Sequence, residues 1–205
     1  FNFSETTFVL APGDPRHTRR VRIFTPGGEL PFAGHPTVGT AFVLATIGEI
    51  ALTGDETRIV FEEGVGPVPV TIRSSGGSPD FAQLSVAQLP EFGPPPPSTS
   101  DLASALGLDA GDLLTGTLAP EAVSCGVPFL MVPVRDRAAL GRIRLRLDAF
   151  ERVFARYWTS KVFVFCAEPE LPGSHYRARM FAPSIGVPED PATGSPAVAF
   201  GGYLA

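Results

Sequence analysis

Apolar and polar residues alternate along much of the first half of the chain, a pattern typical of strands with one buried face. The polar turn Gly13-Asp14-Pro15 should join the first two strands as an antiparallel pair, with Phe8 and Leu10 on one face of the first. Short strands are predicted at residues 5–10, 20–24, 58–62, 68–73 and 82–87.

One segment of the first half has no polar face. From Pro36 to Ile47 the residues are apolar or small all round, and none is charged. A helix of this composition is expected to be buried on every side. We therefore predict that a sheet wraps around this helix.

The second half combines apolar strands with amphipathic helices. Ser100 is expected to cap a short helix that runs to Leu106 and ends at Gly107. Apolar residues at helical spacing between Phe150 and Tyr157 predict a second helix. Strands are predicted at residues 127–134, 161–167 and 176–181.

One motif occurs in both halves. Arg22-Ile23-Phe24-Thr25-Pro26 recurs as Arg179-Met180-Phe181-Ala182-Pro183, and each copy leads through a turn into a helix opened by glycine. A strand–turn–helix unit repeated once at long range indicates a duplicated two-domain protein, whereas a solenoid would have shorter and more numerous repeats. We expect α+β domains at residues 1–93 and 101–205, joined by a proline-rich linker at 94–100.

Both glycine-opened turns have features of an anion site. Pro36 and Pro196 suit a first helical position, which would place His35 and Ser195 at the N-caps. The preceding glycines, Gly34 and Gly194, let the backbone approach a ligand closely. First-turn N–H groups and the helix dipole favour a carboxylate or phosphate. One such turn would indicate only a well-capped helix, but two suggest that both helix starts face one ligand between the halves.

Composition limits the classes of protein that the chain can belong to. Its 205 residues are 44% hydrophobic, which is enough for a core, and the net charge of -5 argues against nucleic acid as a partner. The densest basic run, Arg135–Arg146, is interpreted as the solvated face of a strand and loop. No apolar run approaches the roughly 20 residues that span a bilayer, and Cys125 and Cys166 look like core thiols of a reducing compartment. These features predict a cytoplasmic protein without membrane contact.

The chain begins at Phe1 without Met and stops within a predicted helix at residues 201–205. We expect both ends to be truncated, so the question of whether the full-length protein has a targeting segment stays open.

Few residues are candidates for chemistry. Glu5 begins the first strand between apolar neighbours that would desolvate it and suit it to general acid–base work, although a carboxylate at a strand end is more often a surface residue. Asp190 either stabilises the second helix start or binds a substrate amine or hydroxyl. The remaining carboxylates considered, Glu29, Glu62 and Glu63, are expected to be solvated.

Cofactor and metal signatures are missing. His35 has no second His or Cys at ligand spacing, so no metal is predicted. His17 and His175 lie in polar, loop-like surroundings. No phosphate loop, dinucleotide fingerprint or nucleophile elbow occurs, and Lys161, the only lysine, lacks a phosphate cradle. If the protein is an enzyme, cofactor-free acid–base chemistry is expected.

Three blocks of sequence resemble the phenazine-biosynthesis PhzF-like family in the family's order, and the resemblance spans essentially the whole chain. The blocks are Asn2-Phe3-Ser4-Glu5-Thr6-Thr7-Phe8-Val9, the run from Phe24 to Gly39 that contains Pro31-Phe32-Ala33-Gly34-His35-Pro36-Thr37, and Glu189-Asp190-Pro191-Ala192-Thr193-Gly194-Ser195. Two departures are Pro196, where the family more often has a small residue, and length, since family members continue past both ends.

The resemblance implies a diaminopimelate-epimerase-like fold of two pseudo-symmetric domains, each a curved sheet around a central helix. It also implies cofactor-free isomerisation of a small carboxylate-bearing metabolite, dihydro-3-hydroxyanthranilate in the family's namesake. Glu5 matches the residue that shuttles the proton. The matching substrate-binding residues are Gly34, His35, Asp190, Gly194 and Ser195.

Two alternatives stay open. One is an amino-acid racemase or epimerase with Glu5 as a single base; a two-thiol racemase is disfavoured because neither helix turn carries a cysteine. The other is a non-catalytic small-molecule-binding protein on the same fold, against which the intact set of Glu5, His35 and Asp190 argues. Relatives commonly dimerise, so a homodimer is also left open.

Overall fold

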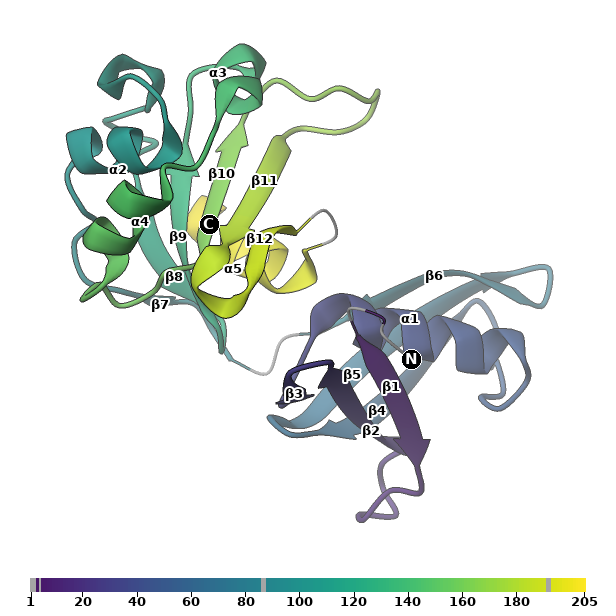
Figure 1. The fold of residues 1–205 in the computed structure, drawn as a ribbon. Coiled ribbons are helices and arrows are strands. Elements are labelled where there is room, and N and C mark those ends of the chain that lie inside the picture. The colour runs from purple at the N-terminus through teal and green to yellow at the C-terminus, as the bar shows by residue number, and fades with distance from the viewer. Residues whose placement is uncertain (1–2, 4, 86–87, 191–192) are drawn as a thin grey trace. The chain divides into compact units, whose positions relative to one another are not determined.

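The computed structural model describes residues 3, 5–85, 88–190 and 193–205. The chain divides into two compact units, Phe1–Gln88 and Leu89–Ala205, and each contains a six-stranded sheet (Figure 1). Asn2 and Ser4 of the first motif block, Val86 and Ala87 of a predicted strand, and Pro191 and Ala192 of the third block lie outside the described residues.

The sheet of the first unit has the order β1-β2-β4-β5-β6, with β3 paired to β2. The antiparallel pairing of β1 with β2, from Thr6 opposite Phe24 to Leu10 opposite Arg20, confirms the predicted pair. β2 runs parallel to β4, and the other pairs are antiparallel. The elements are β1 (Thr6–Leu10), β2 (Arg19–Thr25), β3 (Gly28–Leu30), α1 (Gly34–Thr46), β4 (Glu56–Glu63), β5 (Gly66–Ser75) and β6 (Ser78–Leu84).

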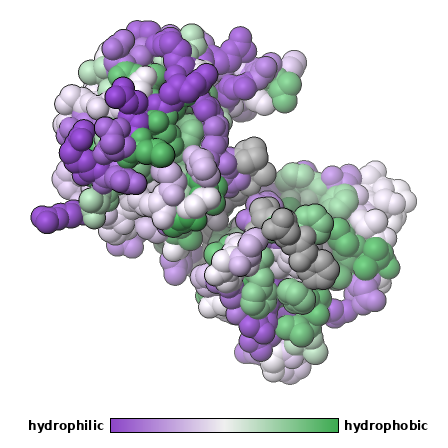
Figure 2. Space-filling model, in the orientation of Figure 1, coloured by the Kyte–Doolittle hydropathy of each residue, from purple (hydrophilic) through white to green (hydrophobic). Residues whose placement is uncertain are grey.

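Helix α1 packs against one face of this sheet, chiefly along β6, through Ala41, Leu44 and Ala45. The expectation that α1 is buried on every side is wrong for the described residues. Val43 is 55% exposed and Ile47 is 64% exposed. Apolar residues accordingly appear on the surface of this unit in Figure 2. Composition alone could not show this, because a helix without polar residues does not indicate how many of its sides a sheet covers.

The sheet of the second unit has the order β12-β11-β10-β9-β8-β7. β9 and β10 run parallel, and the remaining pairs are antiparallel. The strands are β7 (Glu91–Phe92), β8 (Glu121–Ser124), β9 (Pro128–Pro133), β10 (Val162–Cys166), β11 (Arg177–Ala182) and β12 (Val187–Asp190). The helices are α2 (Thr99–Leu106), α3 (Arg137–Arg142), α4 (Leu147–Phe154) and α5 (Gly194–Leu204), with short 3-10 turns at Ala110–Asp112 and Pro183–Ile185.

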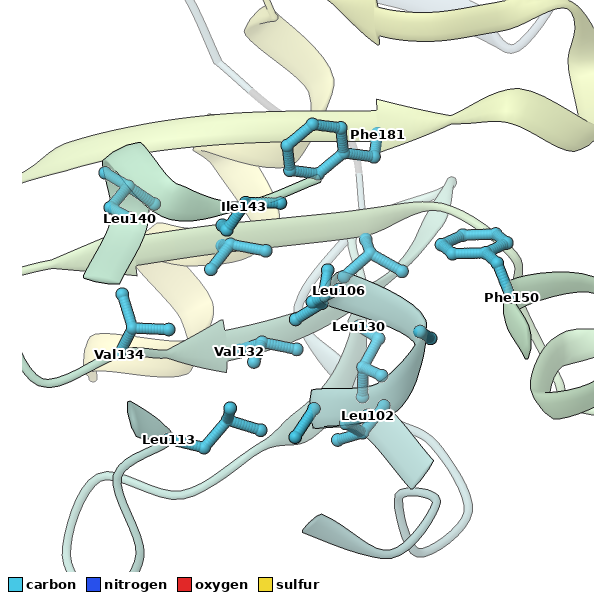
Figure 3. Close-up of a cluster of buried hydrophobic side chains, with 14 of the residues drawn as sticks. Leu102, Leu106, Leu113, Leu130, Val132, Val134, Leu140, Ile143, Phe150 and Phe181 are labelled. Carbon is cyan, nitrogen blue, oxygen red and sulfur yellow. The ribbon is translucent and has the colours of Figure 1, made fainter. Parts of the chain in front are cut away.

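Both faces of this sheet are covered, which explains why β9 and β10 read as continuous apolar runs. On one face Leu130 and Val132 pack with residues of α2, α3 and α4 (Figure 3). On the other face Met131 and Phe163 pack with aromatic residues of α5, among them Phe200. Successive residues of a strand point to opposite faces, so one strand serves two cores.

Helix α2 ends as predicted but begins differently. Gly107 terminates it in the left-handed conformation with φ 68°, which glycine adopts without a Cβ penalty. The cap is Ser98, whose side chain accepts the N–H of Asp101, and the expectation that Ser100 is the cap is wrong. The polar run Ser98-Thr99-Ser100 offers three similar candidates, and only the backbone geometry distinguishes them.

The first copy of the duplicated motif is held by an arginine that binds a carboxylate. Arg22 on β2 donates two hydrogen bonds to Glu29 on β3, of 2.8 and 2.7 Å, and its guanidinium lies 4.9 Å from the centre of the Phe24 ring. This bidentate geometry lowers the pKa of the Glu29 carboxyl. Glu29 is exposed, as expected, and it is also paired with Arg22.

The second copy makes the same contacts. Arg179 on β11 donates to Glu189 on β12 at 2.7 and 2.8 Å and lies 4.9 Å from the centre of the Phe181 ring. The repeated sequence therefore builds the same local structure in both units, in which an arginine on one strand ties the next strand and covers an aromatic ring.

Glu62 on β4 holds the turn between β1 and β2. Its carboxylate accepts the backbone N–H groups of Gly13 and Asp14 at 2.8 and 2.7 Å and lies 2.8 Å from Nδ1 of His17. These interactions lower its pKa to about 2. The expectation that Glu62 is an ordinary solvated carboxylate is therefore wrong.

Leu130→Ala is expected to lower the free energy of unfolding by about 2–5 kcal/mol, because the wild-type side chain is fully buried and its removal leaves a cavity. Leu147→Ala is the matched control. Leu147 is 55% exposed, so its loss should change stability by no more than about 0.5 kcal/mol. Urea unfolding followed by circular dichroism measures both, and equal effects would contradict the assignment of this core.

Glu62→Gln is expected to lower the urea midpoint at pH 7, because the neutral amide loses charge-assisted hydrogen bonds from the turn. The pKa of Glu62 is depressed in the folded state, so its stabilisation is complete above pH 4.5 and is lost as the pH falls towards 2. The difference between the two proteins should shrink over that interval. Glu56→Gln, a substitution of an exposed residue on the same strand, is the control. A constant difference for Glu62→Gln would refute the prediction.

Candidate active site

Glu5 and His35 meet in the first unit. Glu5 immediately precedes β1 and His35 is the second residue of α1. Nε2 of His35 lies 3.4 Å from Oε2 of Glu5, with 45% of the histidine side chain and 22% of the glutamate side chain exposed. A carboxylate and an imidazole at this separation can hold and exchange a proton while both stay accessible to a ligand. Two of the predicted site residues, 30 positions apart in the sequence, are thus brought together.

The neighbouring threonines fix β1 against α1. The hydroxyl of Thr40 donates to that of Thr7 at 2.9 Å, and Thr40 is almost fully buried. Thr7 follows Glu5 by two residues on the strand. This hydrogen bond therefore sets how the entry of β1 lies along the helix.

Both helices begin two residues earlier than the sequence analysis predicted, which placed Pro36 and Pro196 at the first helical position. α1 begins at Gly34 after an extended Ala33 with φ -151°, and α5 begins at Gly194 after an extended Thr193. His35 and Ser195 are therefore second helical residues, not N-caps. This leaves the His35 side chain available to Glu5, whereas a capping side chain would turn back onto its own helix.

The first turn of α1 combines backbone donors with a histidine. Gly34 is buried, and the turn carries no acidic residue. The N–H groups at a helix start and the positive end of the dipole attract anions. An acidic residue in this turn would compete with a ligand carboxylate, so its absence from α1 suits an anion site.

Glu63, expected to be solvated, is buried to 9% exposure beneath this turn. Its Oε1 lies 2.6 Å from the Thr37 hydroxyl, and burial raises its pKa to about 7. The sequence did contain the signal. Ile59, Phe61 and Glu63 alternate on β4, so the period of two that buries the first two also buries the third.

The predicted residues of the second unit lie around the start of α5. Asp190 is the last residue of β12, opposite Met180 on β11, and Gly194 and Ser195 open the helix. Glu189, next to Asp190, is held by Arg179, whose hydrogen bonds lower its pKa. The expectation that the two helix starts bind one ligand stays a prediction.

Metal-binding geometry is not found: among the described residues, no three His, Cys, Asp or Glu side chains converge as a metal ion would require. Cys125 and Cys166 are free thiols, and burial raises the pKa of Cys125. None of the helices in the described part of the chain combines the length and apolarity needed to cross a membrane.

Comparison with known proteins agrees with the motifs and the fold. A model of the family described as phenazine biosynthesis-like protein matches residues 1–205. The chain therefore belongs to the phenazine biosynthesis-like, or PhzF, family.

Curated relatives include named isomerases. The chain is 40% identical to an uncharacterized isomerase of Mesorhizobium japonicum, over 100% of this chain and 67% of the relative. It is 34% identical to the trans-2,3-dihydro-3-hydroxyanthranilate isomerase of Pseudomonas aeruginosa, over 96% of this chain and 63% of the relative. The chain thus spans about two thirds of the length of these relatives.

Solved structures share the fold. A PhzF-family phenazine biosynthesis protein of Bacillus anthracis superposes with a TM-score of 0.86 at 28% identity, over 100% of this chain and 66% of that one. The expected α+β, diaminopimelate-epimerase-like fold is confirmed.

Thr40→Val is expected to lower the free energy of unfolding by about 1 kcal/mol, because it removes a largely buried hydrogen bond between α1 and β1. The control is Thr46→Val at the exposed end of the same helix, where the hydroxyl bonds only to Phe42 O within the helix. Thermal unfolding of both variants measures the difference. Equal destabilisation would contradict the role given to Thr40.

Proposed function

We propose that the protein is a cofactor-independent isomerase of a small carboxylate-bearing metabolite, with Glu5 as the proton shuttle. The observation that supports this most directly is the 3.4 Å approach of His35 to Glu5 at the start of α1. Membership of a family with named isomerases supports the same reaction class.

In the proposed reaction Glu5 removes a proton from one carbon of the substrate. The electron pair of the broken C–H bond shifts through an adjacent double bond, and Glu5 returns the proton to another carbon. Substrate and product have the same formula, so the step needs no oxidant or second substrate. His35 holds a polar group of the substrate next to the carboxylate that carries the proton.

The substrate carboxylate is proposed to bind backbone N–H groups at a helix start, where the dipole favours negative charge. Gly34 offers such a position in the first unit. The family resemblance adds Asp190, Gly194 and Ser195 of the second unit as substrate-binding residues. We further propose a cytoplasmic location, in keeping with two free cysteines.

Glu5→Gln is expected to reduce turnover by at least about 100-fold, in the range typical of losing a general base, while ligand affinity changes little because the amide fills the same volume. The measurement is proton NMR of trans-2,3-dihydro-3-hydroxyanthranilate in deuterated buffer, with the full-length protein. Glu49→Gln, an exposed glutamate in the same unit, is the control and should retain activity.

The outcomes separate the possible functions. Conversion lost in Glu5→Gln and kept in Glu49→Gln supports the isomerase. Conversion kept in Glu5→Gln refutes the proposed base. Deuterium incorporation with optical inversion of an amino acid would instead indicate a racemase, and tight binding of carboxylates without exchange would indicate a non-catalytic binding protein.

A further inference from the structure

Glu63 lies directly beneath the first turn of α1, outside the residues that the proposed reaction uses. It is the last residue of β4, and its side chain reaches Thr37, two residues beyond His35 on the helix. The residue is more than nine-tenths buried. An ionisable group in such a position requires an explanation, because burying an unpaired charge is costly.

Counting protons at Thr37 identifies the form of Glu63. The Thr37 hydroxyl oxygen lies 2.8 Å from the carbonyl oxygen of Ala33 and 2.6 Å from Oε1 of Glu63. A hydroxyl has one proton, and a carbonyl oxygen can only accept. One proton cannot make two linear hydrogen bonds, so both short contacts are fully satisfied when Thr37 donates to Ala33 and a protonated Glu63 donates to Thr37.

The second carboxyl oxygen supports the same form. Oε2 of Glu63 is buried, with no hydrogen-bond partner among the described residues. In an ionised carboxylate this oxygen would carry part of an uncompensated charge, whereas in the neutral acid it is a carbonyl oxygen, which costs less to bury unpaired. Desolvation accordingly raises the pKa of Glu63 to about 7.

The charged groups around Glu63 are engaged elsewhere. Glu62, the preceding residue on β4, binds the turn at Gly13 and Asp14 together with His17. On β5, Arg73 lies opposite Glu56 at the far end of the paired strands.

The elements α1, β2 and β3 also carry charged residues. His35 on α1 lies against Glu5. Arg20 on β2 is opposite Glu62, and Glu29 on β3 is bound by Arg22. Burial and the Thr37 contact are therefore the two influences on the Glu63 proton.

We propose that Glu63 is a positioning residue, which in its neutral form donates a hydrogen bond to Thr37 and thereby holds the first turn of α1 in place. Ionisation removes this donor and leaves two oxygen atoms, those of Glu63 and Ala33, to compete for the single Thr37 proton. The turn that carries Gly34 and His35 then loosens. The effect on turnover rests on the proposed function, but the protonation and its effect on the turn do not.

The first experiment measures protonation directly. Full-length protein labelled with ¹³C in its glutamate carboxyl groups is titrated by NMR from pH 4 to 9, and the Glu63 signal is assigned as the one lost in Glu63→Gln. A midpoint near 7 is expected. A midpoint below 6 overturns the proposal.

The second measurement follows the helix turn. The backbone amide signals of His35 and Thr37 should shift with the same midpoint as the Glu63 carboxyl in the wild type. Glu63→Gln should abolish this component, because an amide donates to Thr37 at every pH. If the chemical shifts of these amides do not change with the midpoint of the Glu63 carboxyl, the positioning role is refuted.

Variants at Thr37 keep the proposal testable if Glu63→Gln does not fold. Thr37→Ser retains the hydroxyl and should preserve the coupling between carboxyl and turn. Thr37→Val removes the hydroxyl and should abolish it. Equal behaviour of the two variants would contradict the proposal.

If the protein turns over the tested substrate, wild-type activity should fall up to about tenfold from pH 6 to pH 8 as the neutral fraction of Glu63 declines. Glu63→Gln should lack this fall. Failure of turnover in every protein would exclude trans-2,3-dihydro-3-hydroxyanthranilate as the substrate, and the NMR titration would still test the protonation of Glu63 by itself. Active proteins with the same pH profile would refute the link between Glu63 and the site.

Discussion

The docking of α1 onto its sheet is the constraint on which the candidate active site depends. Apolar burial holds the helix against the sheet, but it is not directional and would tolerate rotation or sliding. Hydrogen bonds are directional, and two threonines on one side of the helix, Thr37 and Thr40, reach side chains of β4 and β1. With both contacts made, the first turn has one position, in which His35 faces Glu5.

The duplicated motif forms the same contacts in both units. Arg22 and Arg179 each bind a glutamate on the neighbouring strand and lie over an aromatic ring at the same distance. A guanidinium is suited to this because its planar fork matches a carboxylate while its face stacks on a ring. Apart from these contacts the two units differ. The sheet of the second unit has helices on both faces, whereas the sheet of the first unit has α1 on one face.

The alternation of apolar and polar residues predicted the central strands, because a period of two reflects the geometry of each strand by itself. It missed the strands β3, β7, β8 and β12, and the helix α3 lies in a run that was interpreted as strand and loop. The sequence pattern also predicted the pairing of β1 with β2 and the family. It was wrong about helix starts, where neighbouring residues are similar candidates, and about Glu63, where residue type was given more weight than its place on the buried face of β4. The sequence pattern could not predict the contact of Glu5 with His35, because the motifs place both residues in a site without setting the distance between them.

The amino-acid sequence by itself determined the central strands, the duplication, the family and the candidate residues, because each is encoded in local spacing or in a contiguous motif. Only the tertiary structure decided which side of α1 is covered, which carboxylates are paired and which is buried without charge. These properties depend on the low-dielectric surroundings and on partners tens of residues away, such as Thr37 for Glu63 and Glu5 for His35. No local pattern specifies the distance between such partners, because it is set by how the helix and the strands pack together.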